Sequence, residues 1–382
     1  MVTLVAKLLR GSTANVKFPD LLFRSTDNQQ GDPSRPFAYI FINLLLIDIR
    51  STIPSLMEML ASQSYSTTAI RLADSYDILC SFIMYLLENL GPDTDFTDDS
   101  QPAILPPDLL LKLRRDFSET FSLTLEFFRD RWEATVTGAS GLDPSARLDP
   151  NAPLTLTWDN PSLSPAGDPI VLAGLRALSL WLREDDNPQL HEQAVGNMDM
   201  FIPLYSASML PDAKADFRHP IITAFSGIFP GSDDAVQAFL NHKGWPVLAD
   251  DLVQCYRSLG GQKANCYPPT HMQDLIRVLI VVVESSAVPQ SQQLWMETVR
   301  MMAKSSTPDV NDVETLETVV GGWHLAVSIL SKAPKRLQRT FSGDARMIKG
   351  LAQRVLDKIG VAMGDGLGDS LIEIVEALEE LE

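Results

Sequence analysis

Apolar residues recur at helical spacing along most of the chain, and strict alternation of apolar and polar residues is almost absent. One apolar row in residues 66–89 advances in steps of four and three, and a second row follows in residues 110–132. The first row comprises Leu72, Tyr76, Leu79, Ile83, Leu86 and Leu90. The second comprises Leu110, Leu113, Phe117, Phe121, Leu125, Phe128 and Trp132. Further helices are predicted near residues 36–50, 53–61, 190–209, 218–229, 232–241, 246–259, 270–287, 291–304, 309–332, 343–361 and 369–381. The pattern therefore predicts an all-α protein.

Residues 169–205 contain the unit from which we expect the fold to be built. An apolar-faced helix is followed by a polar turn with Asp and Pro, and then by a second apolar-faced helix. Such a unit of about 40 residues is typical of armadillo and HEAT repeats. We therefore predict that residues 1–382 form a single armadillo/HEAT-like α-solenoid of stacked helical hairpins, interrupted by two irregular loops.

The two irregular loops are expected at residues 91–108 and 138–168. The first is acidic and contains proline, which indicates a surface loop. The second combines Gly, Pro, Asp and Ser with little apolar periodicity, and residues 154–158 form its one strand-like piece. We interpret the second loop as a disordered insertion, and the alternative is an element that folds on contact with a partner.

The two ends of the chain differ in character. Residues 365–382 are acidic and carry an apolar face, which predicts a capping helix at the end of the array. The first ten residues are apolar and lack a polar capping helix. We therefore expect that upstream repeats are missing.

Composition and charge narrow the choice of partners. The chain has 382 residues, 45% of them hydrophobic, and a formal net charge of −18. This charge repels phosphate backbones and anionic lipids, so we expect no nucleic acid partner and at most a peripheral membrane contact. The apolar runs near residues 39–48 and 280–283 are too short to span a bilayer. The three cysteines are too few for a disulfide framework, and we predict a cytoplasmic protein.

Enzyme signatures are absent from the sequence. It contains no GxxxxGK[ST], GxGxxG, HExxH or GxSxG motif, and its five histidines are dispersed. His324 falls in an apolar segment and is interpreted as a core residue, and Cys255 and Cys266 are interpreted as buried thiols. We therefore predict no catalytic residue, no cofactor and no metal ligand.

Residues 332–358 form a basic segment in this acidic chain. We take six of its cations as a candidate interaction patch: Lys332, Lys335, Arg336, Arg339, Arg346 and Lys349. The segment is suited to an acidic peptide, a phosphate group or a lipid headgroup, and pairing with the acidic C-terminal helix is the alternative that we favour. Ser342 follows an apolar residue and an arginine, as basophilic kinases require, and is a candidate phosphorylation site.

Two segments carry a resemblance to a known family. Residues 37–60 read FAYIFINLLLIDIRSTIPSLMEML, and residues 175–187 read LRALSLWLREDDN. These segments resemble the middle region and the Leu-rich helices of the neurochondrin family, whose fungal members have an armadillo-type fold. The likeness runs through most of the chain but lacks the N-terminal repeats of that family. The resemblance implies a cytoplasmic adaptor. Animal members of the family are associated with neurite outgrowth, with restraint of a calcium/calmodulin-dependent kinase and with binding to receptor tails.

We conclude from the sequence that the chain is a non-enzymatic scaffold that binds a protein or peptide on its solenoid surface. The alternative is a peripheral membrane or receptor-tail adaptor that acts through residues 332–358. An all-α hydrolase with dispersed catalytic residues is a distant third hypothesis.

Overall fold

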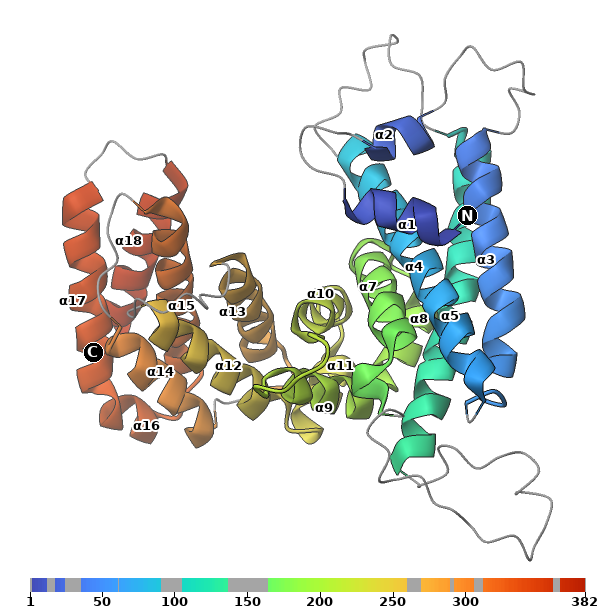
Figure 1. The fold of residues 1–382 in the computed structure, drawn as a ribbon. Coiled ribbons are helices and arrows are strands. Elements are labelled where there is room, and N and C mark those ends of the chain that lie inside the picture. Colours follow the sequence, from blue (N-terminus) through green and yellow to red (C-terminus); the bar gives the residue numbers. More distant parts are fainter. Residues whose placement is uncertain are drawn as a thin grey trace, which may run out of the picture. The chain divides into compact units, whose positions relative to one another are not determined.

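A computed structural model describes ten stretches of the chain. They are residues 2–11, 18–24, 36–60, 62–90, 105–136, 164–259, 269–288, 292–305, 312–359 and 365–381. Within these stretches the regular structure is entirely helical, which confirms the all-α class (Figure 1). The chain divides into two compact units, residues 1–224 and 225–382.

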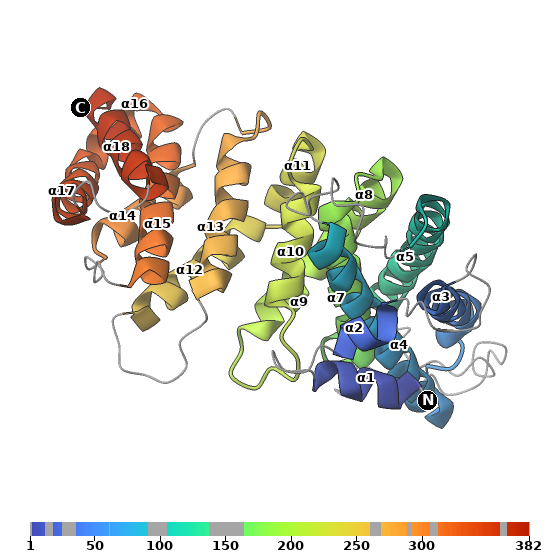
Figure 2. The ribbon, with the colours of Figure 1, turned by 90° about the horizontal axis from the view of Figure 1, so that it is seen from above.

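The first unit contains nine helices and one short 3₁₀ helix among its described residues, and its last helix continues into the second unit. They are α1 (Val2–Arg10), α2 (Phe18–Phe23), α3 (Phe37–Leu56), α4 (Gln63–Leu90), α5 (Pro107–Val136), η2 (Pro165–Gly167), α7 (Pro169–Glu184), α8 (Pro188–Val195), α9 (Met198–Ser208) and α10 (Arg218–Ile228). The long helices α4 and α7 pack together extensively, and α3 lies along α5 (Figures 1 and 2).

Aromatic side chains fill the core of the first unit. The rings of Phe117 and Trp181 stack with centroids 4.6 Å apart, which joins α5 to α7. Tyr76 is fully buried on α4, and its hydroxyl forms a hydrogen bond of 2.6 Å with the hydroxyl of Thr124. A hydroxyl buried in this way needs a partner, and the two helices supply one to each other.

The second unit contains the remaining described helices. They are α11 (Asp233–Asn241), α12 (Gly244–Leu259), α13 (Pro269–Glu284), η3 (Gln293–Trp295), α14 (Met296–Ala303), α15 (Val313–Ser331), α16 (Lys335–Thr340), α17 (Ser342–Ile359) and α18 (Asp365–Glu380). Helix α15 is central, because it packs against α13, α14 and α18. The rings of Trp245 and Trp295 stack with centroids 4.1 Å apart.

Helix α18 corresponds to the acidic C-terminal segment. Its side chains Leu371, Ile374 and Leu378 are buried, and the helix packs against α15 and α17 (Figure 2). Asp369, Glu373, Glu376, Glu379 and Glu380 are exposed, as expected for the polar side of an amphipathic helix.

Two predicted helix boundaries are wrong. The helices expected at residues 36–50 and 53–61 are one continuous helix, α3, which includes Pro54. The buried face passes through Ile49, Ile53 and Leu56, so packing maintains the helix although the proline cannot donate a backbone hydrogen bond.

The single helix expected at residues 190–209 is instead two helices, α8 and α9. They are separated at Gly196 and Asn197. The side-chain amide of Asn197 donates to the carbonyl oxygen of Gln193 at 3.0 Å, a local bond that competes with continuation of the helix.

Most of the two predicted loops lies outside the described residues, namely 91–104 and 138–163, and so does the strand-like piece at 154–158. The described end of the first loop joins α5 at Pro107. In the second, residues 165–167 form the 3₁₀ helix η2.

Candidate interaction surfaces

Helix α3 has two apolar faces, one buried and one exposed. The buried face contacts α5, α4 and α2. It comprises Ala38, Ile42, Leu45, Leu46, Ile49, Ile53 and Leu56. The exposed face carries Phe37, Ile40, Leu44 and Ile47, which are 58%, 43%, 58% and 50% exposed. We call these four residues the α3 row. An exposed apolar row of this kind is typical of an interaction site.

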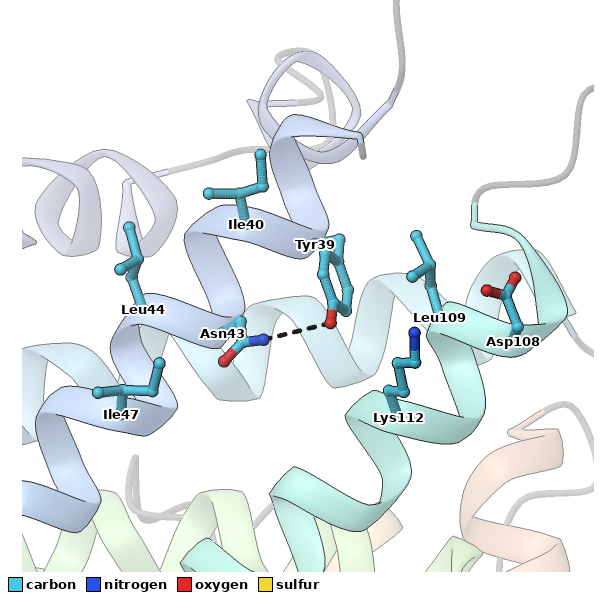
Figure 3. A pocket seen from close by; sticks show the side chains of 8 residues that line it. All are labelled: Tyr39, Ile40, Asn43, Leu44, Ile47, Asp108, Leu109 and Lys112. Atoms are coloured by element: carbon cyan, nitrogen blue, oxygen red, sulfur yellow. Dashed lines mark hydrogen bonds between the residues drawn. The ribbon is translucent and has the colours of Figure 1, made fainter. Parts of the chain in front are cut away.

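A pocket of about 530 Å³ lies between the α3 row and the first turns of α5 (Figure 3). Its lining residues are Tyr39, Ile40, Asn43, Leu44 and Ile47 of α3, with Asp108, Leu109 and Lys112 of α5. The Asn43 side-chain amide donates to the Tyr39 hydroxyl at 3.3 Å, which holds the two polar side chains beside each other (Figure 3). The pocket lining is thus half apolar, from Ile40, Leu44, Ile47 and Leu109, and half polar.

The length and apolar composition of α3 also satisfy the criterion for a membrane span, as no other helix among the described residues does. The expectation that this segment is too short to span a bilayer rested on its apolar run, which contains Asn43 and ends at Asp48. One such helix is weak evidence for a span, since core helices of soluble proteins meet the same criterion. Two charged residues near the middle of α3 are paired with other helices, Arg50 with Glu119 at 2.6 Å and Asp48 with Arg71.

The six cations of the candidate patch are divided by the structure. Lys332 donates to the carbonyl oxygens of Ser285 at 3.0 Å and Val288 at 3.4 Å. Lys349 pairs with Glu379 of α18 at 3.3 Å, which is an instance of the pairing with the acidic C-terminal helix that the sequence favoured. These two cations therefore have partners inside the second unit.

The other cations of the patch are exposed. Lys335, Arg336 and Arg339 lie on the short helix α16, and within the described part of the chain no ion pair involves them. Arg346 is exposed on α17. We call Lys335, Arg336 and Arg339 the α16 cations.

Ser342 is the first residue of α17, and its hydroxyl donates to the carbonyl oxygen of Arg339 at 3.0 Å. The side chain is half-buried. A phosphate at this position would lie at a helix N-terminus beside the α16 cations, where negative charge is favourable. Phosphorylation of Ser342 remains a prediction.

A second pocket in the first unit, about 470 Å³, has a thiol and an imidazole in its lining. Cys80 and His219 both contribute to it, together with Glu88. Burial and the nearby Asp77 carboxylate raise the pKa of the Cys80 thiol to about 12. Because only a thiolate is an effective nucleophile, this pocket is poorly suited to cysteine-based catalysis at neutral pH.

The interpretation of His324 as a core residue is wrong. His324 is exposed and lines a pocket of about 430 Å³ between α13, α15 and α18. His324 lies on the narrow exposed side of α15, and most other residues of this helix are buried. Glu317 and Ser370 line the same pocket, but in the described part of the chain no hydrogen bond joins His324 to either.

Three buried side chains of the second unit come together although they are apart in the sequence. Asp251 and Cys255 belong to α12, and His271 belongs to the first turn of α13. Their ligand atoms, a carboxylate oxygen, Sγ and a ring nitrogen, all lie within 4.8 Å of one another. His271 Nε2 and Asp251 Oδ2 are 3.0 Å apart and share a hydrogen bond. The sequence gives no sign of this cluster, because the i, i+4 pair is indistinguishable from an ordinary helix face and His271 follows 16 residues after Cys255.

Comparison with known proteins supplies the family. The neurochondrin family profile matches residues 6–370. An uncharacterized protein of Schizosaccharomyces pombe is 26% identical over 280 residues, which covers 69% of this chain and 44% of the relative. The chain thus spans less than half the length of the curated relative that it matches. No solved structure matches it. Because the profile covers almost the whole chain, the chain belongs to the neurochondrin family.

Proposed function

We propose that this neurochondrin-family chain is a non-enzymatic scaffold that binds an amphipathic helix of another protein along the α3 row. Exposure of the row carries the proposal, because four large apolar side chains lie together on one helix face. The family assignment is consistent with an adaptor.

The spacing of the α3 row indicates what kind of partner fits it. Positions 37, 40, 44 and 47 are separated by three, four and three residues. This is the a/d spacing of a coiled-coil seam, in which each apolar side chain inserts between side chains of a facing helix. The row extends from residue 37 to residue 47, or about 15 Å of helix, so three turns of a partner helix are enough to cover it.

The ends of the partner helix would meet polar groups. Asp108 and Lys112 lie at the edge of the pocket that adjoins the row (Figure 3). A rim of this kind selects register and orientation more than it adds affinity, because exposed ion pairs contribute little free energy.

The broader setting is part of the proposal. We propose an armadillo/HEAT-like arrangement of helical pairs and a cytoplasmic location. Consecutive packed pairs such as α11 with α12, α12 with α13 and α17 with α18 support the arrangement. The low number of cysteines supports the location.

The proposal is tested with the substitution Leu44→Glu, which places a charge in the middle of the row. We expect this variant to lose a partner that co-purifies with the wild-type chain from its native cells. Leu210→Glu is the matched control, because Leu210 is 57% exposed, lies two residues after α9 ends and is far from the row in sequence. The control should retain the same partner, and circular dichroism should be unchanged in both variants. Retention of the partner by Leu44→Glu would exclude the row as its binding site.

A second candidate function rests on the α16 cations. Three exposed cations without an ion pair among the described residues, next to a helix N-terminus, are suited to a negatively charged surface. The chain would then be a peripheral adaptor at an anionic membrane, which acts through residues 332–358.

Vesicle flotation tests this second function. If it is correct, the wild-type chain floats with vesicles that contain phosphatidylserine, and flotation falls as salt increases. The triple substitution Lys335→Glu/Arg336→Glu/Arg339→Glu should abolish flotation. Lys304→Glu serves as the control, because Lys304 is an exposed cation directly after α14 and outside the basic segment. A wild-type chain that never floats rules out this function.

A further inference from the structure

We propose that Asp251, Cys255 and His271 bind one Zn²⁺ ion, which links α12 to α13. The proposal goes beyond the scaffold function and is independent of it. It rests on the identity, geometry and burial of the three side chains.

The three donor types indicate zinc. A thiolate sulfur, an imidazole nitrogen and a carboxylate oxygen are the ligands that zinc takes in proteins. Calcium and magnesium require oxygen ligands, so a set that includes Cys255 is unsuited to them. The mixed donor set therefore distinguishes this cluster from the many exposed acidic groups of the chain.

The two helices bring the donors to one point. Asp251 and Cys255 are four residues apart on α12, which places them on one face, one turn apart. His271 faces them from α13, which packs against α12. Zinc–ligand bonds of about 2.0–2.3 Å in tetrahedral geometry place ligand atoms about 3.3–3.8 Å apart. All three donor atoms already lie within 4.8 Å of one another, so only small side-chain rotations are needed.

Because the three side chains are buried, the filled site must have little or no net charge to be stable. Asp251 and Cys255 are 0% exposed and His271 is 7% exposed. An isolated buried charge is costly. A zinc ion with one carboxylate, one thiolate and one neutral imidazole has no net charge, so the filled site is neutral. Binding forms a Zn–S bond and releases the thiol proton of Cys255 to solvent, which makes affinity rise with pH.

The alternative to a metal site is that the cluster is only a hydrogen-bonded pair between the two helices. The hydrogen bond between His271 Nε2 and Asp251 Oδ2 joins the two helices by itself. Three protein ligands also leave a fourth zinc position for water, because a tetrahedral ion takes four ligands. The experiment must therefore separate a metal centre from a hydrogen-bonded pair.

The first measurement is made on the wild-type full chain, loaded with one equivalent of Zn²⁺ and dialysed. Elemental analysis should find about one retained zinc per chain. X-ray absorption at the zinc edge should show one sulfur at about 2.3 Å with nitrogen and oxygen at about 2.0–2.2 Å. Failure to retain zinc, or a shell made only of oxygen, would overturn the proposal.

The second measurement assigns the ligands. Cys255→Ser should remove the sulfur from the zinc shell, and His271→Gln should lower zinc retention. Cys80→Ser is the matched control, because Cys80 is a thiol of α4 in the first unit, and it should leave the zinc shell unchanged. A sulfur signal that survives Cys255→Ser would contradict the assignment.

Thermal unfolding gives a readout that does not depend on the variants folding equally well. Ligand that binds only the folded state raises Tm, so zinc should raise the Tm of the wild-type chain and of Cys80→Ser. It should leave the Tm of Cys255→Ser unchanged. If Cys255→Ser does not fold, the zinc-edge spectrum and the zinc-dependent Tm of the wild-type chain decide the proposal.

Discussion

At the scale of single residues, close packing in the second unit depends on a glycine. Gly322 lies on α15, and a Cβ atom built there would be 2.0 Å from the Tyr256 hydroxyl and 2.8 Å from Met302 Sδ. The Tyr256 hydroxyl donates to the carbonyl oxygen of Thr318 at 3.3 Å in the same region. No other residue fits at position 322 without displacing these neighbours.

Gly322→Ala should therefore destabilise the chain. Forcing a methyl group into a filled core typically costs about 1–3 kcal/mol. Gly350→Ala is the matched control, because Gly350 lies on α17 with nothing within 4 Å of its added Cβ, and alanine favours a helix by about 0.5–1 kcal/mol. The free energy of unfolding in urea checks both substitutions. Equal effects of the same sign would contradict the packing at Gly322.

Asp233 shows how a surface carboxylate makes stability depend on pH. Hydrogen bonds from Ser286, Ser285 and the backbone of Ala287 lower its pKa, and the Ser285 hydroxyl lies 2.7 Å from Oδ1. A carboxyl group with a pKa lower in the folded than in the unfolded state stabilises the fold above the unfolded pKa of about 3.9. That stabilisation is lost as the pH falls through the folded pKa.

Asp233→Asn should therefore lower Tm at pH 7 and lower it less as the pH falls below about 4. Thermal melts of the wild-type chain and the variant across this range give the difference directly. A Tm difference that stays constant between pH 7 and pH 3 would show that the Asp233 charge has no part in it.

At the scale of elements, the two apolar faces of α3 differ in burial, so substitutions on them should differ in their effect on stability. Leu44 is 58% exposed, and its neighbour Leu45 is 4% exposed. Both are leucines in the same helix, so a comparison between them isolates the effect of burial.

Leu45→Ala should cost about 2–5 kcal/mol, because it leaves a cavity in the core. Leu44→Ala should change the free energy of unfolding by less than about 0.5 kcal/mol. Urea unfolding of the two variants measures the difference. Similar losses in both would mean that Leu44 is covered in the folded chain, which would remove the α3 row as a free surface.

Much of this arrangement was predictable from apolar periodicity. The rows that contain Tyr76 and Phe117 predicted α4 and α5 correctly, since both rows are core faces of long helices. The continuity of α3 through Pro54 was not predictable, because packing of Ile53 and Leu56 outweighs the local cost of the proline.

The candidate sites were less predictable than the helices. Periodicity shows that α3 is apolar but does not show which of its two apolar faces the rest of the chain covers. The cluster of Asp251, Cys255 and His271 depends on how α12 packs against α13, and sequence spacing carries no record of it. The six cations of the candidate patch look alike in the sequence. In the structure Lys332 and Lys349 have partners, whereas Arg336 is exposed.

At the scale of the whole molecule, the net charge of −18 sets the background for every interface. Long-range repulsion opposes approach to other acidic surfaces and is screened beyond about 8–10 Å at physiological salt. The apolar α3 row does not depend on this field, and therefore an interface there should be insensitive to salt. The α16 cations depend on it directly.

Photo-crosslinking tests the central claim most directly. A photoreactive residue replaces Leu44 in the full chain in its native cells, and a second sample carries it at Leu210. The account predicts that position 44 crosslinks to a peptide of another protein whose apolar residues recur every three and four positions, and that position 210 does not. Crosslinks from position 44 only to lipid, or only to peptides of this chain itself, would contradict the claim that the α3 row binds a helix of a partner protein.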